Sequence, residues 1–209
     1  MPDEPAHPLI AAAYNPATWL AERTLFRPYR AYLVEDLQGS VLDIGAGTGA
    51  MFPYFVEHAE HATFHAIEPD PYMRKRAQKR ANRLDLDIEI RDARAEALPY
   101  DAGTFDVVIA SLVFCTIEDP QKAVQEVTRV LKPNGEFRFF EHVADHGWRG
   151  TLQRILAPFW RRAAGGYHLA RHTQHTFVNA EPLEIIELER RLDGLTPVRP
   201  FVRGRMYRP

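Results

Sequence analysis

The sequence contains a single cysteine, Cys115, among its 209 residues. An internal disulfide framework and a cysteine-rich zinc site are therefore excluded. Its longest apolar runs are under ten residues, whereas a helix that crosses a bilayer needs about 20. The first residues, MPDEPAHPLIAAAYNP, carry acids and prolines where a signal peptide has basic residues followed by an apolar run. These absences predict a soluble, cytoplasmic protein.

The sequence also has no large excess of either charge, because 26 basic and 28 acidic residues give a net charge of −2. The charge is nevertheless uneven. From Arg149 onward there are 11 arginines and 5 acids, a balance of +6, which leaves 15 basic and 23 acidic residues, or −8, for residues 1–148. Such a split can mark an end that faces a nucleic acid or a membrane. The basic residues are scattered, which favours a solvated surface with local ion pairs.

The composition, with 45% hydrophobic and 26% charged residues, is that of a globular protein, and the length predicts one enlarged domain. Residues 16–37 have helical periodicity, and Pro28 is expected to kink or split that helix. Strand-like runs then alternate with helix-like runs. The strands are expected at 41–44, 62–67, 86–91, 105–111 and 136–143, and the helices at 49–58, 71–83 and 120–131.

This alternation predicts an α/β fold with a mostly parallel sheet and helices on both faces. The last quarter differs. A helix is expected over 151–165, followed by strands at 183–190 and 198–207 that Asp193-Gly194 joins. Consecutive strands with a short connection pair antiparallel. The sheet should therefore end in an antiparallel C-terminal hairpin.

The strongest motif is Val41-Leu42-Asp43-Ile44-Gly45-Ala46-Gly47-Thr48-Gly49-Ala50. Its glycines occupy the first crossover turn, where they permit positive φ and let a ligand approach the backbone. Read as Gly-x-Gly-x-x-Ala, the motif also fits the dinucleotide fingerprint, in which a helix N-terminus receives a pyrophosphate. The loop alone leaves both interpretations open.

Acidic residues follow three successive strands of the expected sheet. Asp43 precedes Gly45 by two residues, and a carboxylate there would repel a pyrophosphate but suits a cationic amino-acid group. Glu68 is placed to accept from two ribose hydroxyls, which NAD and S-adenosylmethionine share. Asp92 is placed to accept from an adenine amino group. Together they favour a nucleoside with a charged amino-acid tail over a dinucleotide.

Four motifs occur in order: VLDIGAGTG, AIEPD, ARAEALPYDAGTFDVVIAS and EVTRVLKPNGEFRFFEHV. Through them, residues 14–209 resemble the class I S-adenosylmethionine-dependent methyltransferases of the ubiquinone-biosynthesis-like group. The resemblance implies a Rossmann-like class I fold, S-adenosyl-L-methionine as cofactor and no metal. It also implies a helical lid at 1–38, a cofactor-binding core at 39–143, and an acceptor-side helix and hairpin at 144–209.

The same resemblance assigns roles in cofactor binding. The glycines would line the methionine and ribose, Asp43 would face the amino group and Glu68 would hold the ribose hydroxyls. Asp92 and its neighbour would read the adenine edge. The full set of cofactor-binding residues is Asp43, Gly45, Ala46, Gly47, Gly49, Glu68, Pro69, Met73, Asp92, Ala93, Ser111 and Leu112.

A narrower resemblance lies beyond the cofactor motifs. The stretches ASLVFCTIEDP, FRFFEHVADH, YHLAR and VRPFVRGRMY are similar to the methyltransferase-like thiol S-methyltransferases. Those proteins associate with membranes through an N-terminal apolar segment, which the present sequence lacks. Arsenite methyltransferases, which are also related, depend on several cysteines, so Cys115 alone makes that substrate a poor fit.

For a thiol acceptor, the protein must favour the thiolate through a base or a positive charge. His142, which closes the fifth strand, is the first candidate, with a structural histidine as the alternative. His168 and Arg171 are expected to border the acceptor pocket, and Tyr14 to belong to the lid. If their segment is helical, His168, His172 and His175 share one face and could bind a metal, but no further ligand is evident. Cys115 is expected to be a small apolar residue that fills space in the core. Five aromatic residues are expected either to line an apolar acceptor pocket or to belong to the core: Phe114, Phe139, Phe140, Phe159 and Trp160.

The sequence therefore predicts a methyltransferase acting on a small molecule, with thiol S-methylation favoured. The alternatives are C- or O-methylation of a quinone- or phenol-like ring, an NAD-dependent oxidoreductase, and a cofactor-binding module without turnover. The protein is expected to be a monomer or homodimer, without a nucleic-acid partner or an integral membrane segment.

Overall fold

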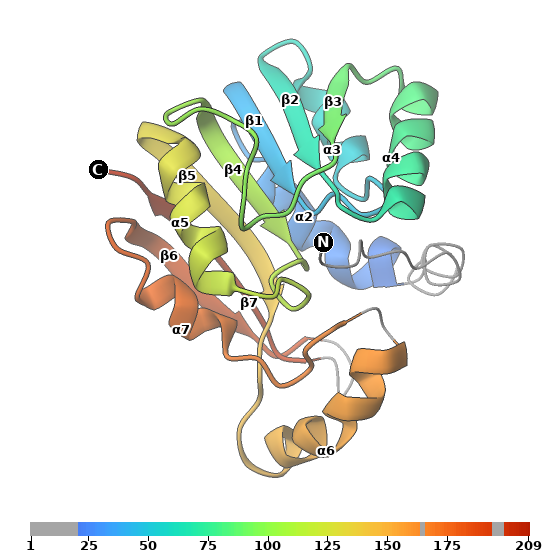
Figure 1. Ribbon diagram of the computed structural model, residues 1–209, viewed down its shortest axis with the longest axis vertical. Helices are drawn as coiled ribbons and strands as arrows, with labels where there is room; N and C mark the ends of the chain where they lie inside the picture. Colours follow the sequence, from blue (N-terminus) through green and yellow to red (C-terminus); the bar gives the residue numbers. More distant parts are fainter. Residues whose placement is uncertain (1–20, 164–165, 194–198) are drawn as a thin grey trace.

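A seven-stranded sheet forms the centre of the protein (Figure 1). The structure is a computed structural model that describes residues 21–163, 166–193 and 199–209. The strand order is β3-β2-β1-β4-β5-β7-β6, in which the first five are parallel and β7 is antiparallel to both of its neighbours. The strands are β1 (Gly39–Ile44), β2 (Ala62–Ile67), β3 (Ile88–Arg91), β4 (Phe105–Ser111), β5 (Leu131–His142), β6 (Glu184–Arg191) and β7 (Phe201–Tyr207). The predicted parallel sheet with an antiparallel C-terminal hairpin is confirmed.

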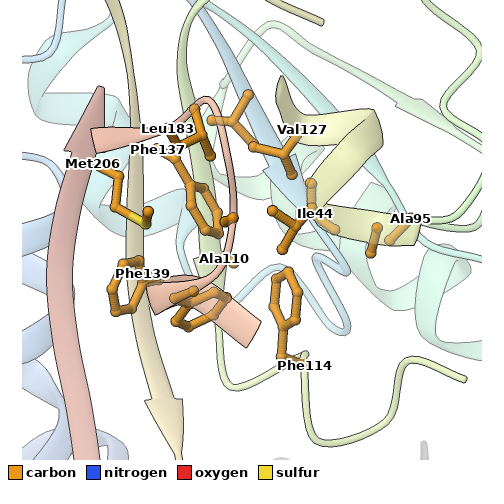
Figure 2. Close-up of a cluster of buried hydrophobic side chains, with 14 of the residues drawn as sticks. Ile44, Ala95, Ala110, Phe114, Val127, Phe137, Phe139, Leu183 and Met206 are labelled. Atoms are coloured by element: carbon orange, nitrogen blue, oxygen red, sulfur yellow. The ribbon is translucent and has the colours of Figure 1, made fainter. Parts of the chain in front are cut away.

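Helices cover both faces of this sheet. Residues of β4 alternate between two apolar clusters, with Val108 in one and Val107 and Ile109 in the other, as expected for a strand buried on both sides. Figure 2 shows the first cluster, to which α5 and α7 contribute; α2, α3 and α4 contribute to the second. The helices are η1 (Glu22–Phe26), α2 (Arg27–Leu33), α3 (Phe52–Phe55), η2 (Val56–His58), α4 (Pro71–Leu84), α5 (Pro120–Val130), α6 (Gly147–Ala163) and α7 (Thr173–Val178).

The boundaries differ from the expected ones where local chemistry intervenes. The N-terminal helix ends at Leu33, and Pro28 lies in the first turn of α2, directly after the π-helical η1. The backbone stays helical from η1 into α2, so the helix changes type before Pro28 and is not split in two. Strand β5 begins earlier than expected, at Leu131, because that residue pairs with Phe105 of β4. Helix α6 begins at Gly147, four residues before the predicted start.

Helix α6 stands apart from the helices that cover the sheet, beyond the end of β5 (Figure 1). None of the helices in the described ranges has both the length and the apolar character needed to cross a membrane. The ends of the parallel strands and this outlying helix next to β5 both bear on the site.

Candidate active site

The carboxyl ends of the five parallel strands meet at one edge of the sheet. Ile44, the last residue of β1, pairs with Ile67 of β2 and with Ala110 of β4. Ligands of open parallel sheets bind at this edge, outside the strand ends. The predicted site residues that close or follow these strands are Asp43, Glu68, Asp92, Ser111 and His142, so the topology brings them to a common edge.

The glycine loop after β1 has the backbone that its sequence requires. Gly45, Gly47 and Gly49 all have positive φ, between 57° and 78°. A Cβ at Gly45 would lie 2.2 Å from Cγ2 of Val113, so that glycine is needed for packing. A Cβ at Gly47 would meet only the carbonyl of Gly45, at 4.0 Å. Gly47 therefore faces open space, which suits the close approach of a ligand.

Asp43 is a carboxylate buried at the end of β1. Among the described residues its Oδ2 atom has no hydrogen-bond partner. The pKa of Asp43 is raised to about 7, mainly by burial; the Arg30 charge lowers it and the nearby Glu68 carboxylate raises it. A buried acceptor without a donor is costly, and it fits a site whose donor arrives with the ligand, such as an ammonium group.

Glu68 follows β2 and holds the glycine loop. Its Oε2 accepts from the backbone N–H of Gly47 at 2.8 Å, and its Oε1 accepts from that of Asp70 at 2.9 Å. Burial raises the pKa of Glu68, against the effect of these two amides. Each carboxylate oxygen keeps lone-pair capacity for a ribose hydroxyl, so loop positioning and the predicted ribose contact are compatible.

The expected adenine side is organised around the start of α4. Asp70 caps that helix by accepting from the N–H groups of Tyr72 and Met73, which fixes the first turn of α4. The Arg74 guanidinium donates to the carbonyls of Glu68 and Pro69. It also forms an ion pair with Asp92 at 2.7 Å. The Asp92 side chain is 53% exposed, and Ala93 beside it is half-buried, so both remain accessible to a ligand.

Arg30 is the main site residue that the sequence interpretation missed. This arginine lies in α2 and is fully buried, and its guanidinium forms a bidentate ion pair with Glu22 at 2.7 and 2.8 Å. A third nitrogen–oxygen contact joins it to Ser111 Oγ at 3.1 Å, and its charge acts on Asp43. Its position in the sequence could have indicated that it is buried, because it falls at helical spacing within the apolar stripe of Phe26, Leu33 and Leu37.

The loop after β4 is held by a second buried carboxylate. Glu141, the penultimate residue of β5, accepts from the N–H groups of Val113 and Phe114 at 2.9 and 3.0 Å. Burial raises its pKa to about 8, with the backbone amides and Arg171 acting in the opposite direction. Leu112, which precedes these residues, has a φ of 59°. Glu141 thus fixes the segment that packs against Gly45.

His142 is fully buried at the end of β5. Its Nε2 lies 3.4 Å from the side-chain nitrogen of Gln153 in α6. The amide of Gln153 is oriented by its other contacts, since its oxygen accepts from the N–H of Asp145 and its nitrogen donates to the carbonyl of Arg199. The nitrogen of Gln153 therefore faces Nε2 of His142 as a donor, which favours the tautomer with the proton on Nδ1.

Three polar residues, Cys115, His168 and Arg171, gather beside the ends of β4 and β5. The His168 N–H donates to the Cys115 carbonyl at 2.8 Å, and the Arg171 guanidinium donates to the carbonyls of Phe114 and Ile117. Burial raises the pKa of the Cys115 thiol far above its usual range. Burial and the charge of Arg171 lower the pKa of His168. The structure thus brings His168 and Arg171 together, and leaves Cys115 a protonated, buried thiol.

Other residues that the sequence analysis singled out do not lie together at this edge or lie outside the described residues. Helix α7 begins at Thr173, so His168 and His172 lie outside it. The described residues contain no group of three or more side chains able to hold a metal. Phe139 and Phe140 are buried in opposite apolar clusters, and Phe159 is 69% exposed, so these three line no acceptor pocket. Tyr14 lies outside the described residues.

Comparisons with known proteins agree with this geometry. A family model described as a methyltransferase domain matches residues 42–139. The chain is 29% identical over 191 residues to the thiol S-methyltransferase TMT1B of Homo sapiens, covering 88% of this chain and 77% of the relative. It is 33% identical over 183 residues to TMT1B of Rattus norvegicus, covering 82% and 74%. Geranyl diphosphate C-methyltransferase of Streptomyces coelicolor, solved with S-adenosyl-L-homocysteine, superposes with a TM-score of 0.71 at 13% identity, covering 95% of this chain and 86% of that one.

The fold and the strand-edge site are those of a class I methyltransferase. The chain belongs to the S-adenosylmethionine-dependent methyltransferase family that includes the thiol S-methyltransferases. The residues present fit the cofactor, because Asp43 offers an acceptor to an ammonium group and Gly47 leaves room for a ligand. Family membership also decides against the NAD-dependent oxidoreductase.

Asp43→Asn tests whether the buried carboxylate serves ligand binding at the expense of stability. The folded-state pKa of Asp43 is raised, to about 7. Its ionised form therefore destabilises the fold increasingly as the pH rises from the unfolded value near 4 to about 7. The variant should gain about 1–3 kcal/mol of unfolding free energy at pH 8 and little at pH 4. Chemical denaturation at both pH values measures this, and calorimetry should show weaker S-adenosylhomocysteine binding. An unchanged stability at pH 8 would contradict the assignment.

Arg30→Met tests the missed arginine through the pKa of Asp43. Since the Arg30 charge lowers that pKa, its removal should raise it, and the pH below which S-adenosylhomocysteine affinity falls should move upward. At pH 7 the affinity should fall about tenfold. Calorimetry across pH 6 to 9 gives the profile, with Arg27→Met, an exposed arginine of the same helix, as the matched control. Equal pH profiles in the two variants would show that Arg30 acts only structurally.

Proposed function

We propose that the protein transfers a methyl group to the sulfur of a small apolar thiol. The observation that carries the proposal is the similarity to the thiol S-methyltransferases over most of the chain. The His168–Arg171 arrangement at the strand edge supports it, because S-methylation needs a thiolate and a place for the thiol proton.

S-Adenosylmethionine, when bound, supplies an electrophilic methyl carbon attached to a sulfonium that leaves as a neutral thioether. The protein must then orient the acceptor sulfur in line with that carbon and exclude water. Asp43 would hold the ammonium group, Glu68 the ribose hydroxyls, and Gly47 would allow the close approach. Asp92 and Ala93 would contact the adenine, and Ser111 with Leu112 would close the site at β4.

His168 is the better placed proton acceptor of the two histidines. It is half-buried and its pKa is lowered by burial and by Arg171, so the imidazole is neutral near pH 7. The acceptor thiol would pass its proton to this imidazole, and the sulfur electron pair would form the new bond to the methyl carbon. The Arg171 guanidinium, which acts on Cys115 and Glu141, would stabilise the developing thiolate.

His142 contributes as an orienting group in this scheme. Its Nε2 faces the donor nitrogen of Gln153, and its ring lies 5.6 Å from that of Tyr167, which directly precedes His168. His142 would therefore fix the segment that carries the base. A lid role for residues 1–38, including Tyr14, a cytoplasmic location and the oligomeric state remain predictions from the sequence.

A panel of acceptors tests the thiol assignment. Alkyl and aryl thiols and hydrogen sulfide should be methylated with S-adenosylmethionine, whereas phenols and quinones of the same size should react at least about a hundredfold more slowly in kcat/KM. Mass spectrometry of the products identifies the methylated atom. Equal or faster turnover of phenols or quinones would replace the proposal by O- or C-methylation. Cofactor binding without any product would indicate a non-catalytic module.

His168→Ala tests the proton acceptor. Loss of a general base lowers turnover by about 10²–10⁴-fold, but a thiol that is already ionised needs none. Turnover of alkyl thiols at pH 7 should therefore fall by about a hundredfold or more and recover as the pH approaches 9, while acidic aryl thiols should be little affected. Initial rates measured for both classes across this pH range give the comparison.

The matched variant His142→Ala should lower turnover for both thiol classes at every pH, because it removes an orienting contact. S-Adenosylhomocysteine affinity should change less than turnover in both variants. An aryl-thiol rate that falls as much as the alkyl-thiol rate in His168→Ala would exclude His168 as the base, and unchanged turnover in His142→Ala would remove His142 from the mechanism.

A further inference from the structure

Helix α6 exposes large apolar side chains to solvent. Trp148 is 67%, Ile155 70% and Phe159 69% exposed. Single exposed apolar residues are common, but a group on one element marks a binding surface. In Figure 1 the helix lies outside the layers that cover the sheet.

The exposed residues form one stripe. With the half-buried Leu152, they follow the spacing 148, 152, 155 and 159, which is i, i+4, i+7 and i+11 on one face of a helix. The opposite face attaches the helix to the protein. Gln153 is fully buried against His142 and Arg199, and a Cβ at Gly150 would lie 2.2 Å from the Asp145 carbonyl. The orientation of the stripe is therefore fixed by packing.

The charge of this helix is of one sign. Its sequence, GWRGTLQRILAPFWRRA, contains four arginines and no acid. Within the described ranges, no carboxylate forms an ion pair with Arg154, Arg161 or Arg162. By contrast, Arg190 pairs with Asp145 and Arg191 with Glu189. At 100° per residue, Arg162 lies beside the apolar stripe, whereas Arg154 and Arg161 lie on the far side of the helix. The local ion pairs expected from the sequence therefore exist in β6 and not in α6.

We propose that α6 is an interfacial helix that docks the protein onto an anionic phospholipid surface. The stripe of Trp148, Ile155 and Phe159 would enter the region between headgroups and acyl chains, with the helix axis parallel to the surface. Arg162, beside the stripe, would extend its guanidinium group to a lipid phosphate, and the other arginines of α6 would add positive charge near the surface. Charge complementarity selects this occupant, since a basic helix with an apolar stripe and a tryptophan matches an anionic interface.

A second copy of the chain fits this surface poorly. In a two-fold dimer the same patch meets itself, which would bring two sets of four arginines together without intervening acids.

Docking through α6 would also place the proposed acceptor side near the lipid, because Gln153 contacts His142 and because Tyr167 and His168 follow the helix closely. The proposal itself does not depend on which acceptor is methylated.

Vesicle sedimentation tests the proposal. The full-length protein should bind large vesicles of phosphatidylcholine and phosphatidylglycerol, and bind vesicles of phosphatidylcholine alone much more weakly. Ile155→Glu combined with Phe159→Glu should weaken binding to the anionic vesicles by on the order of a hundredfold. Arg162→Gln should weaken it by about fivefold and reduce its dependence on salt.

The matched control is Val178→Glu combined with Ile186→Glu, two apolar residues that are 56% and 55% exposed in α7 and β6. This variant should bind the anionic vesicles as the wild type does. S-Adenosylhomocysteine binding and thermal unfolding should be unchanged in all three variants. Three outcomes would overturn the proposal: no binding of the wild type to anionic vesicles, binding that survives both α6 variants, or a lower melting temperature of Ile155→Glu/Phe159→Glu, which would show that the stripe is packed within the protein.

Discussion

A buried carboxylate at the end of β1, one of whose oxygens has no hydrogen-bond donor among the described residues, is the constraint around which the site is arranged. Asp43 lies where burial alone would protonate it, and its pKa of about 7 leaves it balanced between the two forms. The positive charge of the Arg30 guanidinium lowers this pKa and so favours the ionised form of Asp43. Arg30 is in turn neutralised by Glu22 and anchored to Ser111. The N-terminal helix is thereby tied electrostatically to the cofactor site and to β4, as well as by apolar packing.

Two further buried carboxylates, those of Glu68 and Glu141, accept hydrogen bonds from backbone N–H groups. Glu68 accepts from the glycine loop and from the start of the α4 cap, while Glu141 accepts from the loop after β4. The two loops meet where Val113 packs against Gly45. Backbone N–H groups that irregular segments leave unsatisfied are thus paired inside the protein. This pairing gives the strand edge a fixed shape, which a reaction limited by orientation requires.

The sequence was sufficient for those parts of the site that local chemistry determines. Glycines with positive φ, an acid at a strand end and a helix cap at Asp70 each follow from neighbouring residues, and β2 and β4 have the predicted bounds. Arg30, Glu141 and Gln153 could not be assigned in this way, because their roles depend on contacts with residues 28 to 81 positions away, or on another element. Strand alternation places Glu141 and His142 on opposite faces of the sheet, but it could not reveal that Glu141 holds the neighbouring loop. A buried charge in an apolar stripe was the only local sign of Arg30.

The uneven charge of the sequence acquires a structural explanation through α6. Eight of the eleven arginines from Arg149 onward form two groups. Arg190, Arg191, Arg203 and Arg205 pair with carboxylates on β6, on the segment after β5 and on the segment after α2, so they stabilise the antiparallel edge of the sheet. The arginines of α6 have no such partners among the described residues and lie on a helix with an exposed apolar stripe. Folding accounts for the first group. The second group, together with Trp148, Ile155 and Phe159, is what the proposed lipid surface would bind.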